Sequence, residues 1–188
     1  THPERVVFTV NATEALNMAI LGNVRARGRV VATDWAHNSV LRPLYRLRDE
    51  QGVRVDFAAA APKTGTLDIE GLLSAIAEGC DLVVISHASN LTGNVLSDDQ
   101  IAAIAQAAHA VGAPLLMDMA QTAGERPFTM EALGVDLVAF TGHKALMGPQ
   151  GTGGLIVAPG VEVQAIIRGG TGVHSFDEGQ PEAYPRLL

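Results

Sequence analysis

The regular alternation of short apolar runs with amphipathic segments constrains the fold of this chain more than any other feature. The apolar runs are VVFTV, RVVAT, VRVDFA, LVVIS, APLLMDM, DLVAF and GGLIVA. Helical patterns such as TEALNMAILGNV, SVLRPLYRLRDE and DDQIAAIAQAAHAVG stand between them. Nearly continuous apolar strands are typical of parallel strands that are buried on both faces. The sequence therefore predicts an α/β fold with a mostly parallel sheet covered by helices on both faces.

Charge and cysteine content exclude several classes of function. Thirteen basic and twenty acidic side chains give a net charge of −7, which does not favour binding to nucleic acid or to an anionic membrane. The single cysteine excludes an internal disulfide framework and a CxxC zinc site, and the six histidines do not follow the HExxH spacing. We therefore expect no metal site, and a partner that is a small molecule or another protein.

The two ends of the sequence bear on its location and its completeness. The start, THPERVVFTV, lacks the features of a signal peptide, and no apolar run is long enough to cross a bilayer, so we expect a cytoplasmic protein. The polar end, SFDEGQPEAYPRLL, closes no predicted element. No repeat or linker divides the chain. We expect residues 1–188 to form one domain and to be a piece of a longer protein.

Polar residues gather after five of the predicted strands. These clusters span residues 11–14, 34–39, 86–93, 118–124 and 141–144. Taken singly, each has an ordinary structural interpretation, since Thr13 and Ser39 could be helix caps and Asn90 could belong to a turn. However, the carboxyl ends of parallel strands meet at one edge of a sheet, where α/β proteins bind ligands. The sequence therefore predicts that the five clusters converge.

Two charged residues in these clusters are harder to explain by structure alone. Asp118 ends the run PLLMD, and a carboxylate at the tip of a buried strand needs a cationic or hydrogen-bonding partner. Lys144 lies in TGHKALMGPQGTGG, directly after DLVAF. Its glycine-rich turn is not a nucleotide-binding loop, because no G-K-[ST] follows and the turn precedes a strand. A surface lysine and a functional lysine are both compatible with this position.

One cofactor accounts for the whole set of polar clusters. Pyridoxal phosphate needs a lysine for its Schiff base, a carboxylate near its ring nitrogen, and a helix N-terminus with hydroxyl groups for its phosphate. It also requires a flat group against its ring and donors near its phenolic oxygen. In that order, the candidates are Lys144, Asp118, Thr13 with Thr141 and His143, His37, and Asn90 with Gln121.

Five stretches, taken together, resemble the class V aminotransferase family of pyridoxal-phosphate enzymes, and most closely its cysteine desulfurase branch. They are FTVNATEALN, WAHNSVLRPL, SHASNLTG, DMAQTAG and FTGHKALMGPQGTGGL, and they follow the family's order over nearly the whole chain. The resemblance implies fold type I, with Lys144 in the Schiff base, Asp118 on the pyridine nitrogen and His37 stacked on the ring. It also implies Asn90 and Gln121 near the phenolic oxygen, and a phosphate held by Thr13, Thr141, His143 and the backbone of Ala12.

The same resemblance implies a function for the longer protein. It would remove sulfur from L-cysteine, leaving L-alanine and a persulfide on the enzyme, and it would act as a homodimer with a sulfur-acceptor protein. The family's sulfur-carrying cysteine, its arginine for the substrate carboxylate and its small domain lie beyond this chain. Residues 1–188 would thus be the pyridoxal-phosphate-binding large domain. Two alternatives stay open, namely another class V enzyme (an aminotransferase or a carbon–sulfur lyase) and an inactive binding domain with this fold.

The lone thiol, Cys80, is not expected to carry the sulfur. It precedes the run LVVIS, which places it at the amino end of a strand and at the opposite edge of the sheet from the polar clusters. Glu78 and Asp81 flank it and no nearby cation is expected, so the neutral thiol is favoured. We predict that Cys80 is a packing residue.

Overall fold

A computed structural model describes residues 2–170, 178 and 179 of the chain. The polar end that closes no predicted element lies outside the described residues, apart from residues 178 and 179. Among the described helices, none has both the length and the apolar character needed to cross a membrane.

All seven predicted strands are present, and helices connect most of them. In chain order the elements are a 3₁₀ turn (Pro3–Arg5), β1 (Val6–Thr9), α1 (Ala12–Asn23), β2 (Arg29–Thr33), α2 (Asn38–Gln51), β3 (Arg54–Ala58), α3 (Ile69–Ala77), β4 (Leu82–Ser86), α4 (Asp98–Ala110), β5 (Leu115–Asp118), α5 (Met130–Leu133), β6 (Leu137–Thr141) and β7 (Gly153–Val157). The sequence did not predict α5, because a helix of one turn is too short to set up an amphipathic period.

The seven strands form one sheet in the order β1-β7-β6-β5-β4-β2-β3. Neighbouring strands from β6 to β3 pair in parallel, whereas β7 pairs antiparallel with both β6 and β1. Strand β1 therefore runs in the same direction as β6. The carboxyl ends of β1 to β6 consequently lie at one edge of the sheet, which we call the carboxyl edge, and the opposite edge is the amino edge. The prediction of a mostly parallel α/β sheet is confirmed.

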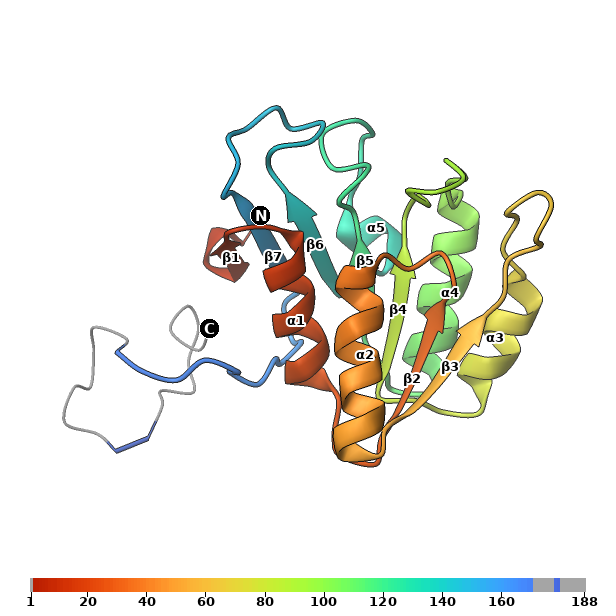
Figure 1. The fold of residues 1–188 in the computed structure, drawn as a ribbon, viewed down its shortest axis with the longest axis horizontal. Coiled ribbons are helices and arrows are strands. Elements are labelled where there is room, and N and C mark those ends of the chain that lie inside the picture. Colours follow the sequence, from red (N-terminus) through yellow and green to blue (C-terminus); the bar gives the residue numbers. More distant parts are fainter. Residues whose placement is uncertain (1, 171–177, 180–188) are drawn as a thin grey trace.

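Helices cover both faces of the sheet (Figure 1). Helices α1 and α2 pack on one face, and α3, α4 and α5 pack on the other. The strands divide their side chains between these two layers by simple alternation: Leu82 and Val84 of β4 point into the core under α1 and α2, whereas Val83 and Ile85 point into the core under α3 and α4. Burial on both faces explains why LVVIS has no polar position, and it leaves the sheet's two edges as the places for polar groups.

Candidate active site

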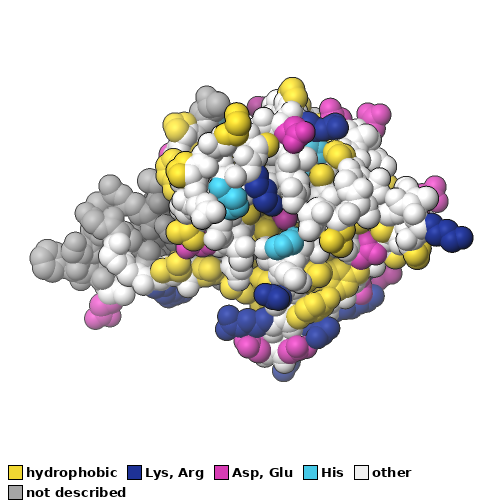
Figure 2. Space-filling view, turned by 45° about the horizontal axis from the view of Figure 1, so that its top comes forward, with side chains coloured by type: hydrophobic (Ala, Val, Ile, Leu, Met, Phe, Trp, Pro, Cys, Tyr) yellow, Lys and Arg dark blue, Asp and Glu magenta, His cyan; other side chains and the backbone are white. Residues whose placement is uncertain are grey.

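The loops at the carboxyl edge surround a cavity in which the predicted site residues meet. Figure 2 shows a hollow in the molecular surface on this side of the molecule, with basic and histidine side chains around it. The cavity is lined by Asn11, Ala12, Thr13, Leu16, His37, Ser39, Ser86, Ala88, Asn90, Asp118, Ala120, Gln121, Thr141, His143 and Lys144. All nine residues predicted from the sequence are in this set. The convergence of the five polar clusters is therefore confirmed, whereas the role of each residue stays a prediction.

The N-terminus of α1 forms one end of the cavity. Asn11 caps this helix, because its side-chain oxygen accepts a hydrogen bond of 3.0 Å from the backbone N–H of Glu14. The interpretation of Thr13 as a cap is thus wrong. Within the described part of the chain, the backbone N–H groups of Ala12 and Thr13 have no hydrogen-bond acceptor. Free N–H groups at the positive end of a helix dipole make this end of the cavity suitable for an anion.

A close backbone approach brings α1 beside the end of β6. Gly153 lies between Thr9 of β1 and Thr141 of β6 in the sheet. A Cβ atom at position 153 would lie 2.7 Å from the backbone of Asn11, so any larger residue would push α1 away. The glycine thus keeps the helix N-terminus next to Thr141, whose hydroxyl shares a hydrogen bond of 3.0 Å with Nδ1 of His143.

Asp118 ends β5 inside the cavity wall and is only 7% exposed. Its Oδ1 accepts a hydrogen bond of 2.9 Å from the backbone N–H of Ala120. Burial raises the pKa of the Asp118 carboxyl, although the Ala120 bond and the nearby Lys144 and His37 side chains act in the opposite direction. A buried carboxylate with one neutral donor is suited to accept a further hydrogen bond from a protonated ligand nitrogen.

Lys144 follows β6 in a compact turn that exposes its side chain. The turn is closed by backbone hydrogen bonds, from Met147 N–H to the Lys144 carbonyl (2.8 Å) and from Gly148 N–H to the Gly142 carbonyl (2.7 Å). The Lys144 ammonium group makes no hydrogen bond or ion pair with any described residue. It is thus a cation without a structural partner at the mouth of a cavity that contains a buried acid.

His37 is the N-cap of α2, and its side chain lines the cavity. Its Nδ1 accepts a hydrogen bond of 3.1 Å from the backbone N–H of Ser39 and lies 2.8 Å from the Ser39 hydroxyl oxygen. That hydroxyl also lies 2.8 Å from Oγ1 of Thr13. Ser39 is therefore not the helix cap that the sequence suggested. It is a cavity residue that connects two predicted site residues, and the sequence offered no signal for this role.

Comparison with known families decides the classification. The sequence matches the family model for aminotransferase class V over residues 1–184. This chain belongs to the class V aminotransferase family. Members of this family are pyridoxal-phosphate-dependent enzymes, so both the predicted family and the predicted cofactor are confirmed.

Class V relatives of known name and structure are similar to most of this chain. A probable cysteine desulfurase of Methanothermobacter thermautotrophicus is 37% identical over 179 residues, which cover 93% of this chain and 43% of the relative. The cysteine desulfurase IscS of Escherichia coli is 33% identical over 173 residues, covering 89% of this chain and 42% of the relative. The chain thus spans less than half the length of these relatives.

Solved structures agree with the observed fold. The apo cysteine desulfurase of Thermococcus onnurineus NA1 superposes with a TM-score of 0.76 and 33% identity, covering 83% of this chain and 38% of that structure. A chain from a SepCysS–SepCysE N-terminal domain complex superposes with a TM-score of 0.70 over 82% of this chain and 42% of that chain, but at 20% identity it supports the fold alone. The fold type I architecture is therefore confirmed.

The chemical groups in the cavity fit the class V cofactor. Its phosphate matches the free N–H groups of Ala12 and Thr13, which also lie beside hydroxyl groups. Its basic ring nitrogen matches the buried carboxylate of Asp118, and its aldehyde matches the unpaired ammonium group of Lys144. No group of three or more His, Cys, Asp or Glu side chains in the described ranges is arranged to hold a metal ion.

Cys80 lies far from these groups in the fold, between α3 and β4 at the amino edge. The thiol is half-buried, and burial raises its pKa, which favours the neutral form. The expectation that no cation lies nearby is wrong, because Arg29 of β2 acts on the thiol and lowers its pKa in part. Arg29 is remote from Cys80 in sequence, so only the pairing of β2 with β4 reveals this neighbour.

Proposed function

We propose that the longer protein containing this chain is a cysteine desulfurase, which removes sulfur from L-cysteine and leaves L-alanine and an enzyme-bound persulfide. One observation carries the proposal: the cavity at the carboxyl edge combines an unpaired lysine, a buried aspartate and a free helix N-terminus. The similarity to named cysteine desulfurases at 33–37% identity supports the choice of this reaction within the family.

Each side chain in the cavity has a role in this proposal. Lys144 binds the cofactor covalently through Nζ, and Asp118 accepts a hydrogen bond from the protonated ring nitrogen. His37 stacks on the ring. The remaining residues hold the two polar ends of the cofactor, with Asn90 and Gln121 near the phenolic oxygen and with Thr13, Thr141, His143 and the backbone N–H of Ala12 around the phosphate.

The chemistry depends on how these residues place charge and protons. The cofactor, when bound, supplies an electron sink for the bonds at the α-carbon of an amino acid. Asp118 favours that capacity because its negative charge keeps the ring nitrogen protonated. When not attached to the cofactor, the Nζ of Lys144 would serve to remove a proton from the substrate and to return one later. His37 limits the motion of the ring so that the reacting bond stays aligned.

Other parts of the reaction belong to the rest of the protein. We place the sulfur-carrying cysteine and the arginine that binds the substrate carboxylate outside residues 1–188. The chain itself serves as the cofactor-binding large domain. We further propose that the protein acts in the cytoplasm as a homodimer and transfers its sulfur to an acceptor protein.

Two measurements on the full-length protein test this function. Incubation with L-cysteine should give equal amounts of alanine and sulfide in the presence of a thiol reductant, and a persulfide on the protein in its absence. Pyruvate and ammonia in place of alanine would indicate a carbon–sulfur lyase, and an oxo-acid-dependent transfer of the amino group would indicate an aminotransferase. A protein that stays colourless with added pyridoxal phosphate would instead be an inactive domain with this fold.

The site of covalent attachment is tested separately. Borohydride reduction of the loaded protein followed by peptide mapping should place the cofactor on Lys144. Lys63 is the other lysine in the sequence, and it lies outside the cavity. Labelling of Lys63 would contradict the proposed site.

A further inference from the structure

A chain of hydrogen bonds links the two ends of the cavity through Ser39. The Ser39 hydroxyl oxygen lies 2.8 Å from Oγ1 of Thr13 and 2.8 Å from Nδ1 of His37. Thr13 belongs to the N-terminus of α1, where the phosphate is placed, and His37 is the proposed stacking residue at the start of α2. The chain therefore connects the phosphate end of the site to its ring end.

The direction of these hydrogen bonds follows from one backbone group. The Ser39 N–H points at Nδ1 of His37 over 3.1 Å, and a backbone N–H can only donate. Nδ1 is consequently an acceptor, and the neutral imidazole carries its proton on Nε2. The Ser39 hydroxyl must then also donate to Nδ1, and its oxygen accepts the hydrogen of the Thr13 hydroxyl. In this arrangement Thr13 donates its single hydroxyl hydrogen to the Ser39 oxygen, so that hydrogen is not available to another acceptor.

A phosphate at α1 is incompatible with that direction. Phosphate oxygens act as acceptors, so Thr13 must turn its hydrogen toward the phosphate to bind it. The Thr13 oxygen is then free to accept, and the Ser39 hydroxyl can satisfy it only by turning away from His37. Nδ1 of His37 still accepts the capping hydrogen bond from the backbone N–H of Ser39, but it no longer accepts one from the Ser39 hydroxyl. Rotation of the Ser39 hydroxyl thus makes the number of hydrogen bonds to His37 depend on whether phosphate is bound at Thr13.

We propose that Ser39 is a positioning residue that couples phosphate binding at Thr13 to the hydrogen bonding, and hence the orientation, of the His37 ring. Without phosphate, two donors hold the ring. One donor holds it when phosphate is present, so the ring is released to settle against the cofactor. The inference rests on the proposed function, because it requires a phosphate-bearing cofactor in this cavity.

The first test needs no cofactor and no turnover. Histidine labelled with ¹⁵N is incorporated into the full-length protein, the His37 signals are assigned with His37→Gln, and inorganic phosphate is titrated at constant pH. We expect phosphate to shift the Nδ1 resonance of His37 in the wild type. Most of that shift should be lost in Ser39→Ala and in Thr13→Val. An undiminished shift in either variant, or no shift in the wild type, would overturn the coupling.

A matched control separates coupling from a general effect of losing a hydroxyl group. Ser74 is an exposed serine in α3 and does not line the cavity. Ser74→Ala should keep the full response of His37 to phosphate. Asn38→Ala, which alters the residue next to Ser39 without removing a hydroxyl, should also keep it. Loss of the response in both controls would mean that any change in the protein disturbs His37, and would overturn the assignment to Ser39.

The second test compares pyridoxal phosphate with pyridoxal, which lacks the phosphate. Without the Ser39 hydroxyl, the His37 ring has one donor whether or not phosphate is bound. Ser39→Ala should therefore strengthen binding of pyridoxal by about 5-fold, the effect of one hydrogen bond, and leave the binding of pyridoxal phosphate nearly unchanged. The double variant with Thr13→Val should bind pyridoxal phosphate no more weakly than Thr13→Val alone, since the two hydroxyl groups act as one unit. Equal changes for both ligands, or additive losses of pyridoxal phosphate binding in the double variant, would overturn the proposal.

Borohydride labelling distinguishes failure of this inference from failure of the function. If the wild type labels at Lys144 but Ser39→Ala treats both ligands alike, only the role of Ser39 is wrong. If the wild type does not label at Lys144, the proposed function fails as well.

Discussion

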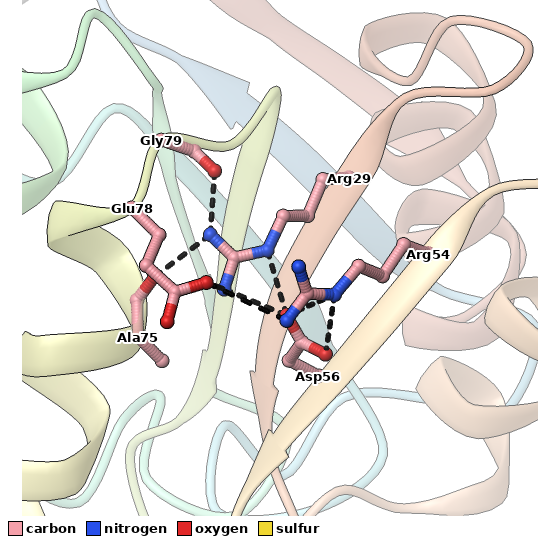
Figure 3. A network of polar contacts seen from close by, with 6 residues as sticks. All are labelled: Arg29, Arg54, Asp56, Ala75, Glu78 and Gly79. Atoms are coloured by element: carbon pink, nitrogen blue, oxygen red, sulfur yellow. Dashed lines mark hydrogen bonds and ion pairs between the residues drawn. The ribbon is translucent and has the colours of Figure 1, made fainter.

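Charged side chains lie at both edges of the sheet, but they are paired with other protein groups at the amino edge and largely unpaired at the carboxyl edge. At the amino edge, Arg29 donates hydrogen bonds to Asp56 and to the carbonyl groups of Ala75 and Gly79, and it also pairs with Glu78 (Figure 3). At the carboxyl edge, the Lys144 ammonium group has no such partner among the described residues, and Asp118 accepts one neutral hydrogen bond.

This difference indicates which cluster is structural and which is functional. The guanidinium group of Arg29 is satisfied by the protein itself, and its side chain is only 13% exposed, so it ties β2, β3 and α3 together. The Lys144 ammonium group and the backbone N–H groups at the start of α1 are left unpaired by the described protein, so they are available to a ligand. A cluster of charges is therefore a weak sign of function, whereas a cluster with unmet hydrogen bonds is a strong one.

The largest expected effect is the loss of Lys144. Lys144→Ala removes the only cavity amine, so covalent attachment of the cofactor and turnover of cysteine should both fall below detection. The absorbance of the loaded protein and alanine release measure the two effects. Lys63→Ala should behave as the wild type in both, and a coloured, active Lys144→Ala protein would remove the basis for assigning function to the carboxyl edge.

Asp118→Asn should leave cofactor binding largely intact but slow catalysis. A neutral amide no longer favours protonation of the ring nitrogen, and loss of one such electrostatic contact lowers kcat by about 10²-fold or more. Steady-state kinetics of alanine release and a separate cofactor titration measure these quantities. Near-normal kcat would reject the role of Asp118 as the partner of the ring nitrogen.

Arg29→Met tests the other edge, with an effect on stability alone. Removal of the largely buried Arg29 should lower the free energy of unfolding by about 2 kcal/mol, since Asp56 keeps only Arg54 as an ion-pair partner and the carbonyl groups of Ala75 and Gly79 lose their donor. Arg54→Met is the matched control: its side chain is 62% exposed, so it should cost only about 0.5 kcal/mol. Urea unfolding measures both. Cofactor affinity should be unchanged in each, and a loss of affinity would show that the two edges are coupled.

Asp118→Asn should raise the free energy of unfolding of the cofactor-free protein, whereas Arg29→Met should lower it. Burial raises the folded-state pKa of this carboxyl above its ordinary value of 3.8, so ionisation opposes folding. That cost is absent well below pH 3.8, where the group is protonated in both states, and it grows as the pH rises from there to the raised pKa, above which it is constant. Asparagine carries no such cost. The variant should therefore be more stable than the wild type at neutral pH, and the gain should vanish in acid.

Cys80→Ser is expected to have the smallest effect. The thiol lies at the amino edge and is favoured in its neutral form by burial, so cysteine turnover and persulfide formation should stay within about 2-fold of the wild type. Mass spectrometry of the protein after exposure to L-cysteine provides the measurement. A persulfide that disappears with this single change would place the sulfur chemistry at the wrong edge for our proposal.

Much of this fold and site could be predicted from the sequence, because both depend on local patterns. The continuous apolar run LVVIS is a direct consequence of burial on two faces, and polar residues after each strand mark the carboxyl edge. Asp118 and Lys144 were predicted to meet for this reason, and they line one cavity. The position of Cys80 at the opposite edge followed from the same rule.

The remaining features depend on contacts between distant segments. Nothing local in the sequence specifies that β7 inserts between β1 and β6, or that Arg29 reaches Cys80 from a neighbouring strand. The role of Ser39 was missed because serine near the start of a helix is ordinarily a cap, and here His37 takes that place. In each case the deciding partner comes from another element.

The position of β7 has a consequence for the order in which the molecule is made. Strand β1 is synthesised before the other described strands, but among these strands it pairs with β7 alone, the last of them in the sequence. Until β7 has been synthesised, β1 has no place in the sheet, and α1 cannot be brought against the turn that carries Lys144. The middle strands can associate earlier, since their neighbours lie close in sequence. A nascent chain should therefore acquire its protease-resistant centre before it gains the ability to retain pyridoxal phosphate.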